Sequence, residues 1–451
     1  MPSMKRTETQ NTNRRPFRVA APGVSRRDFV KRAATGVGGL ALAGMSTAFA
    51  QGNDLIKIGF VSPRTGPLGG FGEGDPYVLE LARKALANGL TSAGKKYKVE
   101  IIDRDSQSDP ARASQLAKAL INTDNVDLML TTSTPEVVNP VSDACEAAGV
   151  PCVSTVLPWE AWYFGRGAKP GQPSPFKWTY HFSFGVAEFA KAYISEWSKA
   201  PFPTNKKVGV MYPNDADGNA LRAHMVPIIE KAGFTVFDPG GYEDGTTDYS
   251  SQIGKYKQAG VQIFTGVPIP PDFATFWRQS AQLGFAKTIK IQSIAKTGLF
   301  PSQMEALGSL GYNIASLCYW HPTFPYKSPL TGATSQQLAS GYEKTSGRQW
   351  NQQLGATQSL LDVGTELLKA ANAKDKAEVA KTLSHLKVTT AVGVVEWGKF
   401  PIANVCPTPL IGAQWIKAKP GSKYKLDLVI VDNADDPNVP IGAKLKPYGF
   451  A

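Results

Sequence analysis

Cysteine, histidine and long apolar runs are scarce in this sequence, and each shortage excludes a class of protein. The 451 residues include four cysteines and four histidines, with no C-x-x-C and no H-E-x-x-H pattern. Metal sites draw on such residues at short spacing, so we expect no metal. Beyond residue 50, no stretch approaches the roughly 18 consecutive apolar residues of a membrane-spanning helix. Charged residues make up only 19% of a chain that is 42% hydrophobic, which excludes disorder and leaves room for two or three packed domains.

The excess of basic residues is concentrated at the N-terminus. The formal net charge is +12, of which residues 1–50 carry +7. There, Arg26 and Arg27 precede a short Gly- and Ala-rich apolar run that ends in Ala48-Phe49-Ala50. This order is typical of an export signal; it resembles a twin-arginine leader and predicts cleavage after Ala50. We therefore expect export to the periplasm by the Tat machinery, a mildly basic and soluble mature protein, and no nucleic-acid partner.

The four cysteines would enter an oxidising compartment after export, where disulfides are permitted but not required. They are Cys145, Cys152, Cys318 and Cys406. Three full pairings are possible, and the sequence alone does not choose between them.

Short apolar runs rich in β-branched residues alternate with helical segments along the rest of the chain. The first unit has expected strands at 55–61, 99–103, 126–130 and 150–153, separated by helices. Such alternation predicts a parallel sheet with helices on both faces. After an aromatic- and Pro-rich stretch at 156–177, the pattern restarts and gives a second unit of similar order. The expected fold class is thus α/β, with two Rossmann-like, doubly wound lobes and a ligand cleft at the carboxyl ends of the strands.

Signatures of enzymes are weak. The loop at 66–75 lies where a dinucleotide fingerprint would lie, but in G-x-G-x-x-G counted from Gly70 the sixth position is Asp75. There is no G-x-S-x-G, and four isolated histidines leave few ways to build a triad. We expect no enzyme, no catalytic residue and no cofactor. The alternative left open is a twin-arginine-exported oxidoreductase that uses a dinucleotide.

Two strand ends are rich in hydroxyl groups. Ser133 and Thr134 follow the third strand, and Thr155 follows the fourth. Hydroxyls and free N–H groups at a helix start can hold a carboxylate, although Thr134 could instead cap its own helix. Nine aromatic residues lie between 159 and 184. Trp159, just past a strand end, is the favoured ligand contact among them; the alternative is that these rings pack the loop itself.

The order of several motifs resembles the periplasmic binding proteins of the leucine/isoleucine/valine type. The motifs are Thr65-Gly66-Pro67-Leu68, Asp105 to Pro110, Gly149-Val150-Pro151 and Asp217-Gly218, within a similarity that covers about 55–417. The resemblance implies the type I two-lobe binding fold with a three-strand hinge. It also implies delivery of a small solute to the permease subunits of an ABC importer in the inner membrane. A ligand sensor for a membrane receptor would share the fold.

The resemblance also implies a division of the chain and a set of ligand contacts. Lobe 1 would comprise 54–181 and 319–390, and lobe 2 would comprise 182–318 and 391–431, between a signal peptide at 1–50 and a tail at 432–451. Hinge residues would lie near Phe182, Tyr319 and Val392. Carried over by position, the ligand contacts are Phe71, Ser133, Thr134, Thr155, Leu157, Trp159, Phe182, Ser183, Asp217 and Lys296.

The expected ligand is a small carboxylate. Amino-acid binders of this family hold the ligand ammonium with acidic residues, whereas Ser183 and Lys296 stand at those places here. A buried ammonium without a carboxylate partner is costly, and Lys296 favours an anionic head group. We therefore expect an anionic head with an apolar or aromatic body, such as an aromatic acid, and leave a branched-chain amino acid open.

Overall fold

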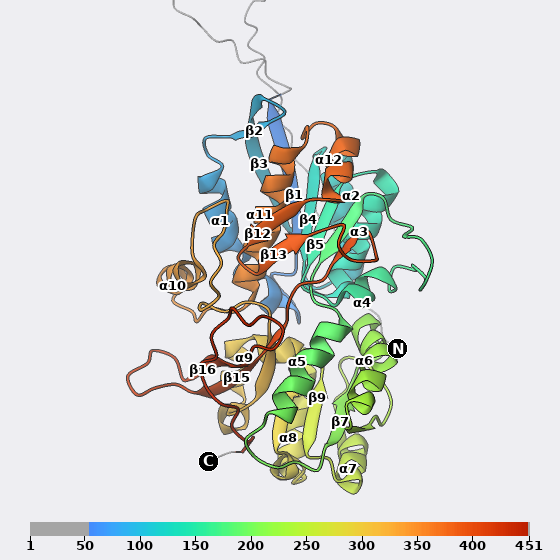
Figure 1. Ribbon diagram of the computed structural model, residues 1–451, viewed down its shortest axis with the longest axis vertical. Coiled ribbons are helices and arrows are strands. Elements are labelled where there is room, and N and C mark those ends of the chain that lie inside the picture. The colour runs from blue at the N-terminus through green and yellow to red at the C-terminus, as the bar shows by residue number, and fades with distance from the viewer. Residues whose placement is uncertain (1–53, 450–451) are drawn as a thin grey trace, which may run out of the picture. The chain divides into compact units, whose positions relative to one another are not determined.

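A computed structural model describes residues 54–449 of the chain, and the predicted leader with Arg26, Arg27 and the cleavage site after Ala50 lies outside them. Within the described residues, the chain forms two seven-stranded sheets and one small hairpin (Figure 1). Helices cover both faces of each large sheet, as the alternation of strands and helices predicts.

The first sheet has the order β14-β6-β5-β4-β1-β3-β2. All neighbours are parallel except β2 and β3, which form an antiparallel pair. Its strands are β1 (Leu55–Ser62), β2 (Leu90–Ser92), β3 (Lys95–Asp105), β4 (Leu128–Thr132), β5 (Cys152–Thr155), β6 (Thr179–Phe182) and β14 (Val405–Cys406). Consecutive strands are added on opposite sides of β1, so the strand order reverses there, and the carboxyl ends beside such a reversal form a ligand crevice.

Helices α2 (Pro110–Asn122) and α3 (Pro135–Ala148) pack together on one face of this sheet. Helices α1 (Asp75–Ala85) and α11 (Gln353–Ala370) pack together on the other. The start of α2 follows from local chemistry: Pro110 occupies its first position and the Asp109 carboxylate accepts a hydrogen bond from the Arg112 N–H. The remaining elements of this lobe are α4 (Trp159–Tyr163), α10 (Ser335–Ser346), α12 (Lys376–Leu383), β12 (Lys387–Thr390), β13 (Gly393–Glu396) and η1 (Gly69–Gly72).

The second sheet has the order β16-β15-β11-β10-β9-β7-β8 and repeats the arrangement of the first around β7. Its strands are β7 (Lys207–Met211), β8 (Thr235–Phe237), β9 (Ile263–Gly266), β10 (Ile291–Ile294), β11 (Ala315–Cys318), β15 (Ile411–Lys417) and β16 (Leu426–Asp432). Its helices are α5 (Val186–Ser198), α6 (Ala216–Lys231), α7 (Ser250–Ala259), α8 (Pro270–Gln282), α9 (Pro301–Ala306), η2 (Ala286–Thr288), η3 (Lys296–Leu299) and η4 (Gly308–Gly311). Strand β15 pairs antiparallel with both β11 and β16, so the edge of this sheet is mixed.

Three connections join the two lobes, as the type I binding fold requires. They run from β6 to α5, from β11 to α10, and from β14 to β15. One expected boundary moves: the resemblance places residues 391–406 in the second lobe, but β13 pairs with β12 beside α11, and β14 pairs with β6 of the first sheet. The edge of the first sheet is thus completed by a segment from late in the chain. The rest of the lobe division stays a prediction.

Candidate functional site

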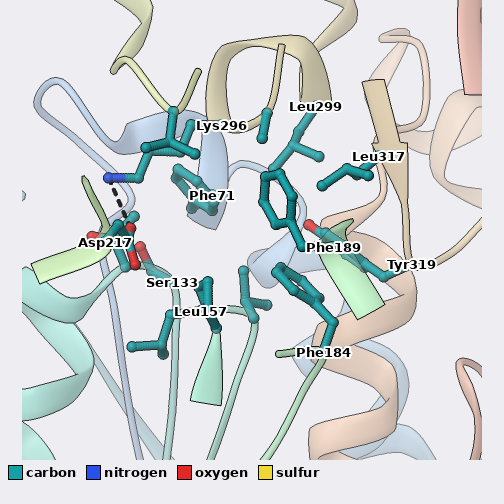
Figure 2. A pocket seen from close by; sticks show the side chains of 15 residues that line it. Phe71, Ser133, Leu157, Phe184, Phe189, Asp217, Lys296, Leu299, Leu317 and Tyr319 are labelled. Carbon is teal, nitrogen blue, oxygen red and sulfur yellow. Dashed lines mark ion pairs between the residues drawn. The ribbon is translucent and has the colours of Figure 1, made fainter. Parts of the chain in front are cut away.

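A pocket lies between the two lobes, at the carboxyl ends of strands from both large sheets (Figure 2). Its empty space, which includes the open mouth, is about 430 Å³. The residues that line it are Phe71, Ser133, Thr134, Val156, Leu157, Pro158, Phe184, Phe189, Asp217, Val267, Ala295, Lys296, Leu299, Leu317 and Tyr319. The topology of the two sheets therefore places this pocket at the strand ends, where the sequence predicts a ligand cleft.

Ser133 and Thr134 form a polar wall of the pocket between β4 and α3. Thr134 has the backbone conformation of a helix cap, yet its hydroxyl makes no capping hydrogen bond. Both side chains are buried, and neither hydroxyl has a hydrogen-bond partner among residues 54–449. An unpaired buried hydroxyl is costly. Because the N-terminus of α3 also favours negative charge, the two hydroxyls are suited to donate to a ligand carboxylate.

Three residues of the pocket have backbone conformations that side chains rarely adopt. The φ angles are +123° at Ser133, +94° at Val156 and +52° at Lys296. They follow β4, β5 and β10, respectively, so three separate loops carry this strain into one site. Such conformations cost about 1–3 kcal/mol each and persist where the surrounding structure enforces them, as at ligand sites.

Lys296 is not a free cation, which corrects the interpretation that it favours an anionic ligand. Its ammonium lies 2.8 Å from Asp217 Oδ2 and 3.2 Å from Asp215 Oδ2, and all three side chains are largely buried. Burial alone would lower the pKa of Lys296, but the carboxylates of Asp215, Asp217 and Glu136 outweigh it and hold that pKa well above its usual value. The lysine charge is thus already balanced within the protein.

Four carboxylates surround the Lys296 ammonium, from Asp215, Asp217, Asp244 and Glu136, and of these only Asp217 lines the pocket. Burial raises the pKa of Asp217 to about 7 against the opposing effect of Lys296, and burial raises that of Asp244 to about 6. Oxygen Oδ1 of Asp217 and Oε2 of Glu136 are buried, with no hydrogen-bond partner in the part of the chain that the structure describes. A ligand group that donates hydrogen bonds and carries positive charge would satisfy Asp217 and restore its ordinary pKa.

The opposite side of the pocket is aromatic. Figure 2 shows the Lys296–Asp217 pair at one end and Phe184, Phe189 and Tyr319 at the other. Phe184 stacks on Tyr319 with ring centroids 6.0 Å apart, and the Tyr319 hydroxyl accepts a hydrogen bond from Gln353 of α11. Phe71 of the first lobe meets Phe300 of the second edge to face, with centroids 4.9 Å apart. These rings can bury an apolar ligand body.

Six of the ten predicted contacts line the pocket, and four do not. Phe71, Ser133, Thr134, Leu157, Asp217 and Lys296 are brought together there, whereas Thr155, Trp159, Phe182 and Ser183 lie outside. Thr155 and Phe182 are ladder partners in β5 and β6, and the Ser183 N–H donates to the Cys406 carbonyl of β14 on the other side of β6. Trp159 packs on Tyr163, Phe164 and Phe400 because α4 turns its ring away from the pocket.

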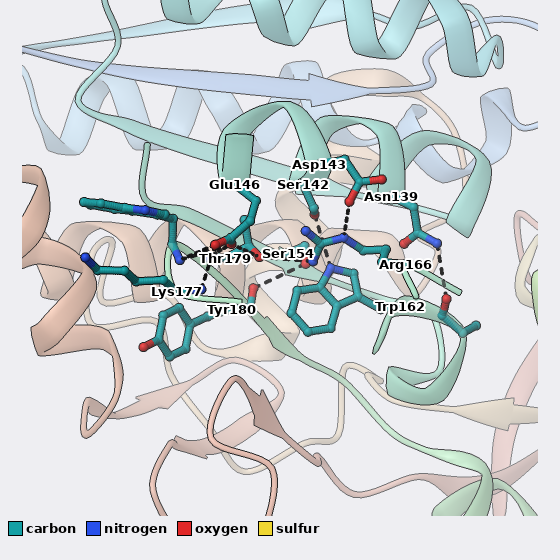
Figure 3. Close-up of polar contacts among 12 residues, drawn as sticks. Asn139, Ser142, Asp143, Glu146, Ser154, Trp162, Arg166, Lys177, Thr179 and Tyr180 are labelled. Carbon is teal, nitrogen blue, oxygen red and sulfur yellow. Dashed lines mark hydrogen bonds and ion pairs between the residues drawn. The ribbon is translucent and has the colours of Figure 1, made fainter. Parts of the chain in front are cut away.

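The aromatic stretch mainly packs its own loop, which is the alternative that the sequence left open. Arg166 has a buried side chain that bonds to Asp143 and Thr179, and its guanidinium lies 4.7 Å from the Trp162 ring (Figure 3). At the end of the loop, the Glu146 carboxylate accepts hydrogen bonds from the backbone N–H groups of residues 177–179. The loop is thereby fastened to α3.

Sequence reasoning missed several lining residues. Phe184 lies in the connection of β6 to α5, Phe189 lies in α5, Val267 follows β9, Leu317 lies in β11, and Tyr319 follows that strand. The rule that ligands lie past strand ends would have pointed to Val267. Leu317 and Tyr319 are two residues apart on one strand and so share a face.

The glycines of the loop at 66–75 serve protein packing. A Cβ on Gly72 would lie 2.4 Å from the Pro63 carbonyl oxygen, and one on Gly74 would lie 2.6 Å from Leu354. This leaves no room at those two positions for the close approach of a pyrophosphate.

Ser154 and His181 are close enough to resemble a catalytic pair. Ser154 lies 2.8 Å from His181 Nδ1, but both side chains are fully buried and burial lowers the pKa of His181 to about 3. This pair is a structural hydrogen bond.

Two further features were searched for in the described residues alone. Residues 54–449 contain no group of three or more His, Cys, Asp or Glu side chains placed to hold a metal ion. Over the same range, no helix combines the length and apolarity needed to cross a membrane.

Known proteins of similar sequence and structure are binding proteins. A Leu/Ile/Val-binding protein homolog of Brucella suis is 26% identical over 254 residues, which cover 54% of this chain and 60% of the relative, so the match spans less than two thirds of that protein. A solute-binding protein of an ABC transporter from R. palustris, solved with 4-hydroxybenzoate, is 18% identical, with a TM-score of 0.66 over 84% of this chain and 96% of the other.

A third likeness is to the substrate-binding protein of a branched-chain amino acid transporter from Streptococcus pneumoniae, solved with isoleucine. It is 15% identical and has a TM-score of 0.62 over 87% of this chain and 99% of the other. At these identities the two structures establish the fold alone. The family model described as periplasmic binding protein matches residues 55–418, so the chain belongs to the periplasmic binding protein family and has its type I, two-lobed fold.

Proposed function

We propose that this protein is the extracytoplasmic solute-binding component of an ABC importer, and that its ligand is an α-amino acid with an apolar or aromatic side chain. The choice of ligand rests on one observation: hydrogen-bond donors and an acceptor without partners line the same pocket. Buried donors at Ser133 and Thr134 face the same space as a buried acceptor at Asp217, within the described residues. A zwitterion supplies one partner for each, and the aromatic wall takes its side chain.

This proposal changes the ligand preferred from sequence, and the reason is the charge of the pocket. An aromatic acid without an ammonium would satisfy the hydroxyls, but it would bring a negative charge near Asp217, Glu136 and Asp244 while Lys296 is already paired. Like charges in a site of low dielectric disfavour one another. The solved relatives include binders of both ligand classes, so the ligand class is decided by experiment.

Binding, not catalysis, is the activity that these groups support. Ligand would bridge the lobes, and rotation about the three connections, near Phe182, Tyr319 and Val392, would close them. The closed form would then dock on the permease subunits. Export by the twin-arginine route, cleavage after Ala50 and a periplasmic location complete the proposal.

A matched set of ligands tests the ligand class. Calorimetric titration would compare phenylalanine with 3-phenylpropanoate, which lacks the ammonium, and with phenethylamine, which lacks the carboxylate; leucine and 4-methylpentanoate form a second pair. We expect saturable binding of at least one amino acid and at least tenfold weaker binding of its desamino partner. Tighter binding of the desamino acids would overturn the zwitterion and restore the aromatic acid.

A further inference from the structure

The end of helix α3 forms a Schellman motif that begins at a cysteine. Gly149 has a φ of +67° after the helix; its N–H donates to the Glu146 carbonyl at 3.4 Å, and the Val150 N–H donates to the Cys145 carbonyl at 3.0 Å. In this motif the side chain of the third residue from the helix end packs against the residue that follows the glycine. By this rule we expect the side chains of Cys145 and Val150 to pack together.

The chain after the motif brings a second cysteine to the same place. Pro151 keeps the preceding residue extended, so side chains at positions 150 and 152 lie on the same side of the chain. Cys152 begins β5, which packs against α3, and its thiol lies in hydrogen-bond reach of the Cys145 thiol. Both are fully buried in the same core.

The other two cysteines have different neighbours. The Cys318 thiol donates to the Trp320 carbonyl at 3.2 Å in the second lobe, and the Cys406 sulfur accepts from the Glu396 N–H at 3.2 Å. Of the possible pairings, the local geometry therefore favours one bond, between Cys145 and Cys152.

We propose that Cys145 and Cys152 form an intramolecular disulfide in the exported protein. The proposal rests on the location outside the cytoplasm that is part of the proposed function. The thiolate of one cysteine attacks the disulfide of an oxidant, either a thiol–disulfide oxidoreductase or oxidised glutathione, and releases one thiol. The second thiolate then attacks the mixed disulfide, releases the second thiol and closes the bond, so two protein thiols are oxidised and one oxidant disulfide is reduced.

The timing of this exchange follows from burial. Burial raises the pKa of Cys145 well above its usual value, with Arg166 nearby opposing the shift, so the packed Cys145 thiol is unreactive. Exchange takes place before the turn at 146–151 packs, or when it opens.

The bond would link two elements that reach the ligand pocket at their other ends. Helix α3 starts at the polar wall of Ser133 and Thr134, and β5 leads into Val156 and Leu157. Figure 3 shows the two elements side by side, with Ser142 and Glu146 from α3 near Ser154 of β5. Closing a loop of eight residues in a chain of this size is expected to raise the melting temperature by about 3 °C.

Peptide mapping tests the proposal without a ligand. The full chain is expressed with its N-terminal segment, isolated from the exported fraction, denatured and alkylated with N-ethylmaleimide without reductant. The tryptic peptide 119–166 holds both cysteines, and we expect it unmodified and lighter by two hydrogens than its reduced form. Cleavage after Glu146 should then give peptides 137–146 and 147–160 joined by a disulfide. Alkylation of all four cysteines would overturn the proposal, whatever the protein binds.

Variants in which one cysteine is replaced by serine provide the control. Reductant should lower the melting temperature of the wild type and of Cys318→Ser by the same few degrees and leave that of Cys145→Ser unchanged. An equal effect of reductant on Cys145→Ser would also overturn the bond. Should Cys145→Ser fail to fold, the peptide map of the wild type still decides.

Discussion

Replacing Ser133 by alanine should strengthen the fold and weaken the binding of ligand. The Ser133 hydroxyl is fully buried and unpartnered among residues 54–449, so in the ligand-free protein it carries a desolvation cost that no hydrogen bond offsets. Leaving a buried polar group unpaired costs about 1–3 kcal/mol. Ser133→Ala removes that cost but keeps the backbone strain at φ +123°. We expect the free energy of unfolding to rise by about 1 kcal/mol.

The same substitution should lower the affinity for the ligand. A hydrogen bond from a hydroxyl to a carboxylate contributes about 1.5–3 kcal/mol, so its loss should weaken amino-acid binding by about 10- to 100-fold. Urea unfolding without ligand measures the first quantity, and calorimetric titration measures the second.

Ser142→Ala is the matched control for this experiment. Ser142 is also a fully buried serine on the same lobe, but its hydroxyl accepts a hydrogen bond from the Trp162 indole at 3.2 Å and lies away from the pocket. Its removal should lower stability by about 1–2 kcal/mol and leave affinity unchanged. If Ser133→Ala destabilised the protein as much as Ser142→Ala and bound ligand normally, the role assigned to the Ser133 hydroxyl would be refuted.

Three other results are expected. Asp217→Asn should weaken amino-acid binding at least tenfold at pH 8 and spare desamino acids; equal losses for both would remove Asp217 from the ammonium site. The pKa of Asp217 in the free protein is raised to about 7, so amino-acid affinity should fall about tenfold from pH 8 to pH 6 as the carboxylate takes up a proton, and titrations of Asp217→Asn should lack most of this slope. Glu146→Ala leaves three backbone N–H groups and the Thr179 hydroxyl unpaired, so urea unfolding should show that the free energy of unfolding falls by about 2–4 kcal/mol. Glu80→Ala, at an exposed ion pair, is the control and should change the free energy of unfolding by less than about 0.5 kcal/mol.

The periodic parts of the fold were predictable from the sequence, and the short strands were not. Apolar spacing, Pro and Gly predict a helix over 136–148 and a strand over 235–237, and the structure has α3 at Pro135–Ala148 and β8 at Thr235–Phe237. Strand β6 at Thr179–Phe182 was missed, since four residues at the end of an aromatic stretch carry no clear period. Strand β14 has only two residues and is defined by its pairing with β6. The paired residues are more than 200 positions apart in the sequence, so no local pattern predicts the strand.

Some residues of the candidate site could likewise be predicted from the sequence, and others could not. Positions fixed by strand ends, such as Ser133 and Asp217, could be predicted because topology alone brings them to the cleft. The state of Lys296 could not, since its partner Asp215 stands 81 positions earlier in the chain. The direction of Trp159 depends on the single turn of α4 and on Gly185, where a Cβ would lie 2.0 Å from the indole nitrogen. That close approach is a property of packing and not of spacing.

The edge-to-face contact of Phe71 and Phe300 has a consequence for the kinetics of transport. The two rings belong to different lobes and Phe71 lines the pocket, so the lobes cannot open without breaking this contact. An aromatic pair of this kind contributes about 0.5–1.5 kcal/mol, and this part of the cost of opening is the same whichever solute is bound. The choice of solute is then set by the polar groups inside the pocket, and the ring contact adds an equal barrier to the release of each solute.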